Sequence, residues 1–344
     1  MRRALLLAVL ATGCAMEPRR PLRPATQVPL APSVRFEVTE LLNLFERELV
    51  RTGSEFVSAP LSLSPFYALL VSWNVDLEPS AGFEVELRVG TSGAEGVAWS
   101  PWLFVGCWGE LPTEGLGERC VRFDGGRIAT DEFVGERWFD RAQVRLLARD
   151  AITPRRVSLC FSGGWGVCMN TGLFGVREVS LPVPARSQHL EDPELAARIC
   201  SPTSLAMVLA YHGIDVPVAE LAALAYDPLH DLYGNWPRSI QAAYSLGLCG
   251  YLARYSSIRD VLAQLEAGRP VILSIAFGAG ELTGAPMAST SGHLLVVVGA
   301  TQAGDLVVND PAAPTLEEVH RVYDRDELER AWLDHGGVAY VLGE

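Results

Sequence analysis

The chain has 344 residues, of which 49% are hydrophobic and 20% charged, the balance of an ordinary globular protein. This composition excludes a largely disordered chain, a collagen-like chain and a coiled-coil rod, and the length is enough for about two domains. The formal net charge of −13 argues against sequence-independent binding of nucleic acid, which needs a dense cationic surface.

The first residues have the pattern of a bacterial export signal. Two arginines precede the apolar run Ala4–Ala11, which is far shorter than the roughly 20 residues that span a bilayer. Gly13 and Cys14 follow, and a cysteine directly after small residues resembles a bacterial lipobox, whose cysteine is lipidated. We expect a signal peptide over residues 1–13 and a protein anchored to a membrane of the cell envelope through Cys14. The alternative is a plain signal peptide and a secreted protein.

Residues 14–34 contain five prolines and no apolar period, which predicts a semi-rigid tether. Residues 35–178 show apolar and polar residues in alternation, separated by Gly, Pro and Ser clusters, which is typical of strands. The clearest predicted strands are 71–75, 83–89, 141–146 and 157–161. Only Leu41–Val50 has a pattern that suggests a short helix. We expect an all-β sandwich domain over residues 35–178, and nothing in its sequence identifies a ligand.

Residues 185–344 change character. Helical periods are followed by apolar, strand-like runs, which predicts an α+β domain and a multidomain chain. The predicted helices are 202–212, 218–225 and 258–267, and the predicted strands are 271–277, 294–298 and 306–308.

Cys200 is the first residue of this region with a chemical signature. Ser201 is a good N-cap and Pro202 suits the first helical position, so Cys200 stands at the N-terminus of a helix that stops near Gly213. The positive end of a helix dipole favours a thiolate, which is the nucleophilic form of cysteine. A buried structural cysteine explains this element alone equally well.

A histidine and two polar residues downstream make the catalytic interpretation stronger. His293 opens an apolar strand, and the next strand ends in Asn309 and Asp310 after a short polar turn. A hairpin brings Asn309 and Asp310 near His293, within a residue or two of register. A histidine oriented by a carboxylate or an amide is the base that an activated cysteine requires.

These residues resemble the peptidase C39-like family of papain-fold cysteine peptidases. The segments that carry the resemblance are Gln188, 200–204, 207–209, 234–237, 268–272, 292–293 and 308–311. The resemblance covers residues 185–344 and implies Cys200 as nucleophile, His293 as base, Asp310 as its orienting group and Gln188 as a donor to the oxyanion. Ser201 departs from the family pattern, in which many members have glycine.

The remaining candidates are weaker. Asn235 and Trp236 either line a substrate cleft or form a buried turn. Outside the cytosol, two pairs of cysteines are close enough in sequence to oxidise, namely Cys107 with Cys120 and Cys160 with Cys168. The spacing of the histidines and cysteines matches no metal site, and we expect no metal and no cofactor.

The sequence therefore predicts a cysteine peptidase that hydrolyses a peptide bond through a thioester. Its partners are a peptide or protein substrate and a membrane. One alternative is a papain-fold acyl transferase or cell-wall amidase, because Cys, His and Asp in this order do not fix the acyl group. The other is a non-catalytic envelope lipoprotein that binds a ligand and whose peptidase domain is retired.

Overall fold

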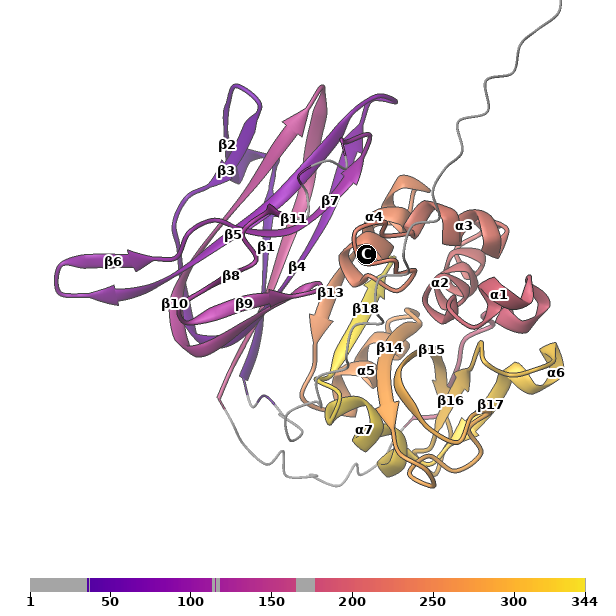
Figure 1. The fold of residues 1–344 in the computed structure, drawn as a ribbon. Coiled ribbons are helices and arrows are strands. Elements are labelled where there is room, and N and C mark those ends of the chain that lie inside the picture. The colour runs from indigo at the N-terminus through magenta and orange to yellow at the C-terminus, as the bar shows by residue number, and fades with distance from the viewer. Residues whose placement is uncertain (1–35, 37, 113–114, 116–117, 165–176, 344) are drawn as a thin grey trace, which may run out of the picture. The chain divides into compact units, whose positions relative to one another are not determined.

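The computed structural model describes residues 36, 38–112, 115, 118–164 and 177–343. The strands in this part of the chain form two antiparallel β-sheets (Figure 1). No helix in this part of the chain combines the length and apolar character needed to cross a membrane. The predicted signal, tether and Cys14 lie outside the described residues.

The N-terminal sheet contains eleven strands, six of them in the order β1-β11-β4-β10-β3-β2. Strands β5 and β9 pair with β10, strands β6 and β7 pair with β5, and β8 pairs with β9. Its strands are β1 (Val38–Phe45), β2 (Leu49–Thr52), β3 (Glu55–Ser58), β4 (Leu61–Leu77), β5 (Gly82–Gly93), β6 (Gly96–Trp99), β7 (Leu103–Gly109), β8 (Arg122–Phe123), β9 (Gly126–Ala129), β10 (Glu132–Arg149) and β11 (Ile152–Gly163). All four strands predicted for this half are present, within β4, β5, β10 and β11.

The helix predicted at Leu41–Val50 is wrong. This segment forms the end of β1, a short 3-10 turn η1 (Glu46–Glu48) and the start of β2. Residues of β1 pair along their whole length with β11, with Leu41 opposite Cys160 and Leu44 opposite Val157. The backbone hydrogen bonds of this ladder outweigh the weak helical period of the local sequence.

The C-terminal sheet contains seven strands in the order β13-β18-β14-β15-β16-β17, with β12 beside β15. Its strands are β12 (Val179–Ser180), β13 (Gly250–Arg254), β14 (Val271–Phe277), β15 (Thr290–Ala300), β16 (Leu306–Asn309), β17 (His320–Tyr323) and β18 (Val338–Leu342). The helices are η3 (Gln188–Leu190), α1 (Pro193–Ala196), α2 (Cys200–Tyr211), α3 (Val218–Ala225), α4 (Trp236–Ser245), α5 (Ile258–Glu266), α6 (Leu316–Val319) and α7 (Arg325–Leu333). The three predicted helices and three predicted strands are confirmed.

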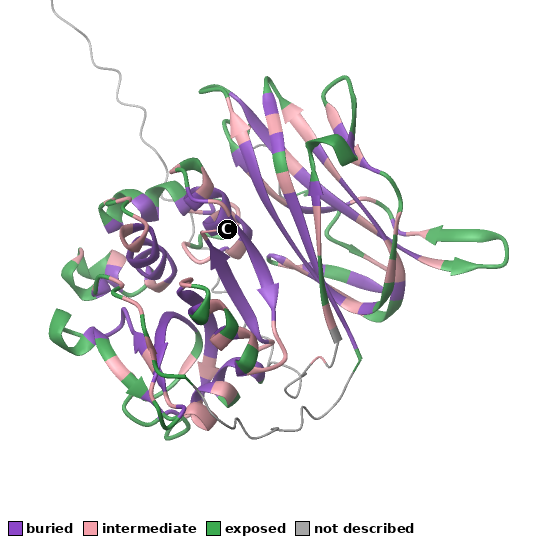
Figure 2. Cartoon of the chain, turned by 180° about the vertical axis from the view of Figure 1, so that it is seen from behind, coloured by how far each residue is buried: buried purple, intermediate pink, exposed green. Residues whose placement is uncertain are grey.

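Strand β15 is buried on both faces, which explains its unbroken apolar sequence. Leu294 and Val296 belong to the same hydrophobic cluster as α2, whereas Leu295 and Val297 pack in a second cluster with α5 and α7. Figure 2 shows this burial along the central strands, while the β5–β6 hairpin is largely exposed. The sheet therefore fixes β15 next to α2, and with it the two segments that carry Cys200 and His293.

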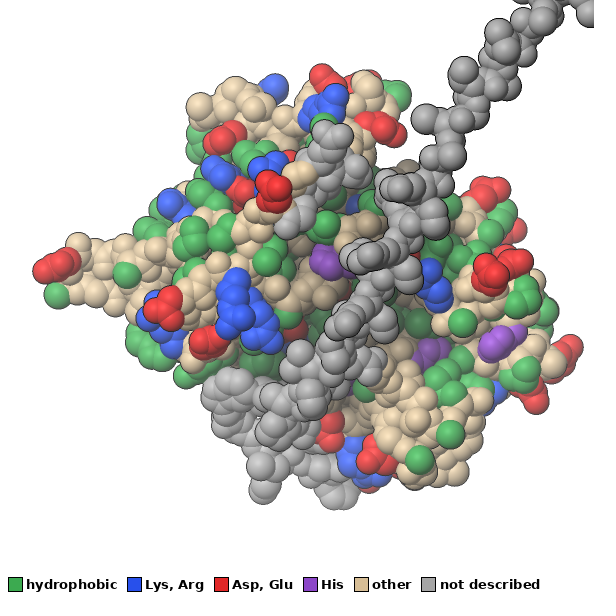
Figure 3. Space-filling view, viewed as in Figure 1, with side chains coloured by type: hydrophobic (Ala, Val, Ile, Leu, Met, Phe, Trp, Pro, Cys, Tyr) green, Lys and Arg blue, Asp and Glu red, His purple; other side chains and the backbone are tan. Residues whose placement is uncertain are grey.

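The described residues all belong to one compact unit. The larger hydrophobic cluster contains side chains from both sheets, among them Trp73 and Val75 of β4 and Leu252 and Tyr340 of the C-terminal sheet. On the face shown in Figure 3, arginines are interspersed with acidic side chains. Several arginines of the described residues form ion pairs, such as Arg119 with Glu84 at 2.7 Å.

Candidate active site

Helix α2 begins at Cys200, with Ile199 at the N-cap position and no side-chain capping bond. The predicted capping role of Ser201 is wrong. Its side chain is fully buried, and its hydroxyl lies 3.2 Å from the hydroxyls of both Ser239 and Tyr340. Ser201 therefore ties the start of α2 to the core instead of covering the end of the helix.

Cys200 is half-buried as a residue, and its thiol is hydrogen-bonded to the ring of His293. The backbone N–H groups of Ser201 and Leu294 also donate to this sulfur. Burial acts to raise the pKa of the Cys200 thiol, but the hydrogen bond and the charge of His293, together with the two N–H donors, lower it overall. Cys200 therefore has the environment of a reactive thiolate.

His293 lies on β15 and is buried, with Nε2 placed 2.8 Å from Oδ1 of Asp310. Asp310 follows the last residue of β16 and is 1% exposed. Its carboxylate also accepts hydrogen bonds from the Tyr323 hydroxyl at 2.7 Å and from the backbone N–H of Ala312 at 3.0 Å. Because Nε2 is engaged with Asp310, Nδ1 is the ring nitrogen left for the thiol of Cys200.

The neighbouring Asn309 points elsewhere. Its side chain donates to the carbonyl of Val183 at 3.0 Å and accepts from the ring of His320 at 2.9 Å. Successive side chains along an extended backbone point to opposite faces, so Asn309 and Asp310 cannot both approach His293. The expectation that both residues come near His293 is therefore corrected, and the carboxylate is the partner.

The charges of this site stabilise one another. Burial acts to lower the pKa of His293, but the carboxylate of Asp310 and the thiol of Cys200 outweigh burial and raise it to about 10. Burial acts to raise the pKa of Asp310, but the charge and hydrogen bond of His293, with the Tyr323 hydroxyl, lower it overall. The arrangement thus favours a thiolate, an imidazolium and a carboxylate in line.

Gln188 lies between the segment after Asp310 and the turn before Cys200. Its backbone N–H donates to the carbonyl of Pro311 at 2.9 Å, and its side-chain Nε2 donates to the carbonyl of Ala196 at 2.8 Å. The side chain is 7% exposed, and its Oε1 has no hydrogen-bond partner among the described residues. Nε2 carries a second N–H, which suits donation to a negatively charged oxygen.

Asn235 is buried at the start of α4 and Trp236, the first residue of that helix, is half-buried, so Asn235 fits the structural one of the two interpretations left open. Asn235 is the N-cap of α4, where its Oδ1 accepts from the N–H of Arg238 and its Nδ2 donates to Asp227 at 2.8 Å. Trp236 packs against the larger hydrophobic cluster. The predicted substrate contact of Asn235 is therefore corrected, because both ends of its amide are already bonded within the protein.

The predicted disulfide between Cys107 and Cys120 is absent, and both thiols are free. The carbonyl of Cys120 accepts from the N–H of Phe104 at 2.8 Å, which places Cys120 three residues along the strand from Cys107. Three residues of a strand span about 10 Å. A disulfide needs Cα atoms within about 7 Å.

Cys160 is also a free thiol, and it is buried. Its sulfur accepts a hydrogen bond from the backbone N–H of Arg254 at 3.1 Å. Burial raises the pKa of both Cys107 and Cys160 to about 11, which makes them poor nucleophiles. The predicted partner of Cys160, Cys168, lies outside the described residues.

Two features of the site had no signal in the sequence. Tyr323 donates to Asp310 from β17, and Ser239 and Tyr340 meet Ser201 from α4 and β18. Each contact joins residues that are brought together only by the pairing of distant strands and helices. Among the described residues, no group of His, Cys, Asp and Glu side chains is arranged to hold a metal ion.

Comparison with known proteins identifies the C-terminal region. Residues 180–340 match the Peptidase_C39 like family, whereas no curated protein matches the chain. A solved structure described as a C39-like peptidase from Bacillus anthracis is 22% identical with a TM-score of 0.38, covering 49% of this chain and 98% of that chain. The peptidase domain of Streptococcus ComA, a bi-functional ABC transporter involved in a quorum sensing pathway, is 20% identical with a TM-score of 0.33, covering 43% and 92%. The family match confirms the resemblance seen in the sequence, and the chain contains a C39-like peptidase domain over residues 180–340.

Proposed function

We propose that the C39-like domain is an active cysteine peptidase and that Cys200, His293 and Asp310 are its catalytic triad. The observation that carries the proposal is the continuous hydrogen-bonded line from the Cys200 thiol through the His293 ring to the Asp310 carboxylate. Replacing a whole buried charged set by well-packed apolar residues is often neutral or stabilising, so the presence of this set favours a catalytic role over a purely structural one.

The chemistry follows from the atoms in place. The Cys200 thiolate, whose proton His293 already holds, attacks the carbonyl carbon of the substrate. His293 then protonates the leaving amine as the C–N bond breaks, which leaves an acyl thioester on Cys200. A water molecule, deprotonated by His293, attacks the thioester and releases the carboxylic acid, which leaves the Cys200 thiolate beside the protonated His293. Asp310 holds the imidazole in place throughout and keeps its charge.

The oxyanion of each tetrahedral intermediate needs two donors. Cys200 is the first residue of α2, so its backbone N–H has no partner within the helix. The second N–H of Gln188 supplies the other donor.

The test is labelling of the mature protein with a thiol-directed peptidase probe, compared with Cys200→Ala. We expect the wild type to be labelled at Cys200 and to cleave a subset of a peptide library, and the variant to do neither. Labelling without cleavage of any peptide would favour a retired domain. Transfer of the acyl group to an added amine, in preference to water, would favour the transferase.

We also propose that the protein is exported and anchored in the bacterial cell envelope, on the sequence of residues 1–14 alone. In this proposal residues 14–34 are the tether and the strand-rich residues 35–178 are a β-sandwich domain that packs against the C39-like domain. The anchored enzyme would then act on peptides or proteins near a membrane.

A further inference from the structure

Strand β13 forms one edge of the C-terminal sheet and pairs only with β18 among the described strands. On such an edge, the N–H groups of alternate residues point away from the sheet and need partners. Three of them donate to side chains of the N-terminal sheet, in the pairs Gly250 with Asn74 Oδ1 (3.2 Å), Leu252 with Ser72 Oγ (3.0 Å) and Arg254 with Cys160 Sγ (3.1 Å). We call Ser72, Asn74 and Cys160 the docking row.

The docking row has the spacing of the strand that it binds. Ser72 and Asn74 are two residues apart on β4, and Cys160 lies opposite Leu70 in the β4–β11 ladder. Rows two residues apart are separated by about 6.6 Å in any strand. The three side chains therefore match the three N–H groups of β13 one for one, and all three are buried.

Two side-chain amides lock the contact in both directions. Asn74 also donates Nδ2 to the carbonyl of Gly250 at 2.9 Å, so its amide bonds both the N–H and the carbonyl of this residue. Gln241 of α4 bonds in the same way to the backbone of Val75 in the N-terminal sheet. Its side chain accepts from the N–H of Val75 at 3.0 Å and donates to the carbonyl of Val75 at 2.9 Å. Such paired amides define a single register.

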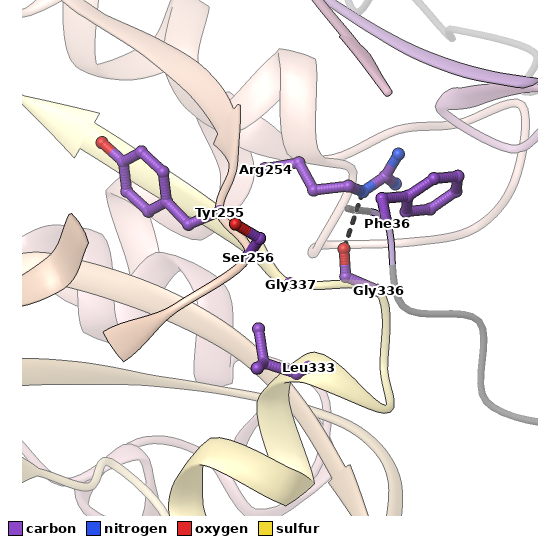
Figure 4. A pocket seen from close by; sticks show the side chains of 7 residues that line it. All are labelled: Phe36, Arg254, Tyr255, Ser256, Leu333, Gly336 and Gly337. Atoms are coloured by element: carbon purple, nitrogen blue, oxygen red, sulfur yellow. Dashed lines mark hydrogen bonds between the residues drawn. The ribbon is translucent and has the colours of Figure 1, made fainter. Parts of the chain in front are cut away.

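Arg254, the last residue of β13, makes further contacts at this end of the strand. Figure 4 shows its guanidinium beside Phe36, whose ring centroid is 4.5 Å away, with Nε bonded to the carbonyl of Gly336 at 2.6 Å. Another nitrogen of the same group lies 2.5 Å from Glu132 of β10. The side chain of Arg254 is 2% exposed, so this ion pair is enclosed by the two sheets.

Helix α4 carries the contact toward the candidate nucleophile. The N–H of Trp236, at its start, donates to the buried carboxylate of Asp131 at 3.0 Å, and Arg238 donates to the carbonyl of Cys107 at 2.7 Å. From the same helix, Ser239 meets the hydroxyl of Ser201. Ser201 follows Cys200 directly in the first turn of α2, so this contact fixes the backbone beside the nucleophile.

We infer that the N-terminal sheet is an intramolecular positioning partner of Cys200: the docking row and Asp131 hold β13 and α4, and α4 holds Ser201 beside the nucleophile. The inference rests on the proposed function of Cys200. It gives the strand-rich half of the chain a role within the protein itself, in which its partner is the edge strand and helix of the C39-like domain.

The experiment compares Asn74→Leu and Gln241→Leu with wild type in the full chain. The matched control is Asn43→Leu, because the Asn43 side chain accepts from Ser158 of its own sheet. Hydrogen exchange of the β13 amides reports docking, and the pH dependence of Cys200 alkylation by iodoacetamide, located by mass spectrometry, reports positioning. We expect at least tenfold faster exchange of β13 and a rise of about one pH unit in the alkylation midpoint in both variants. The control should match wild type.

Asp131 provides a second pair of variants that avoids the docking row. Asp131→Asn keeps an oxygen that accepts from the N–H of Trp236, and Asp131→Ala removes it. Asparagine should retain the wild-type alkylation profile and alanine should shift it, which loss of overall stability alone would not produce.

Two results would overturn the inference while leaving the proposed function intact. One is a wild-type alkylation profile in variants whose β13 amides exchange rapidly, and the other is unchanged β13 exchange in both leucine variants. An ordinary thiol profile in the wild type itself would instead overturn the proposed function, and this inference with it.

Discussion

The hydroxyl of Tyr323 donates a 2.7 Å hydrogen bond to Oδ2 of Asp310, the carboxylate oxygen that His293 does not use. Both side chains are buried, so no water replaces this bond. Tyr323 thus fixes the plane of the carboxylate from one side while His293 is bonded on the other. Asp310 is one of the groups that raise the pKa of His293, so Tyr323 acts on the histidine through the carboxylate.

Replacement of Tyr323 by phenylalanine should destabilise the fold. The Tyr323→Phe variant leaves a charged oxygen buried without this donor, so its free energy of unfolding should fall by about 1.5–3 kcal/mol in urea. Tyr211→Phe is the matched control, because the Tyr211 hydroxyl donates to a neutral carbonyl, that of Gly268, at 3.0 Å. Its loss should be about 1 kcal/mol or less. Equal losses in the two variants would mean that the Asp310 carboxylate is not charged.

Alkylation of Cys200 should depend on His293. Burial acts against the thiolate, but His293 lowers the pKa of the Cys200 thiol overall. Cys200 should therefore react with iodoacetamide well below pH 8.5, the ordinary pKa of a free thiol being about 8.5. His293→Ala should remove this reactivity at low pH. Cys107 and Cys160 serve as internal controls, since burial raises the pKa of each to about 11. Identical pH profiles of Cys200 alkylation in wild type and His293→Ala would show that Cys200 and His293 do not form a pair.

The pH dependence of stability should reveal the same pair. A group whose pKa is raised on folding stabilises the fold below its unfolded pKa, and this stability is lost as the pH rises through the folded pKa. For His293 the window runs from about 6.5, the unfolded value, to about 10. Cys200, whose pKa is lowered, has the opposite sign, and its contribution is lost as the pH falls through its folded pKa.

In wild type, the two effects should cancel between about pH 6.5 and 8.5, where the folded pair and the unfolded pair each hold one proton. In Cys200→Ser the decline should instead begin near pH 6.5, with a slope of up to about 1.4 kcal/mol per pH unit. Urea unfolding at several pH values measures this slope, and Cys200→Ser with His293→Gln supplies the background of all other groups. The prediction is contradicted if the single and double variants have parallel curves.

Gln188 should affect turnover and leave thiol reactivity unchanged. If its amide donates to the oxyanion, Gln188→Ala should reduce the turnover of any peptide that the wild type cleaves by about 10²–10³. The alkylation profile of Cys200 should stay close to that of wild type, because no oxyanion forms in that reaction. His189→Ala is the neighbouring control, since His189 is exposed. A loss of both turnover and alkylation would assign Gln188 a structural role only.

Cys14 should carry lipid in the mature protein. Intact mass spectrometry should find a chain that starts at Cys14 with added acyl mass, and Cys14→Ser should abolish that mass. Two or more acyl chains make membrane attachment stable, whereas a single chain binds only marginally. A mature chain without lipid, or one that begins at another residue, would leave the protein secreted.

The sequence by itself determined the elements that carry the site. Cys200 begins a helix because the residues after it have a helical period, and Gly213, with a φ of 82°, adopts the left-handed conformation that ends one. His293 and Asp310 lie near each other because two apolar runs around a short turn form a hairpin, β15 and β16. These are local properties, since period, turn residues and apolar runs act within a few residues of the chain.

Only the tertiary structure decided which side chains meet. Ser201 has the sequence of a helix cap, yet contacts with Ser239 and Tyr340 draw its hydroxyl into the core. Asp310 is the partner of His293, and Tyr323 fixes that carboxylate from a strand that pairs with β16. These choices depend on hydrogen bonds between residues far apart in sequence, which form only when the sheets are assembled and their buried polar groups must find partners.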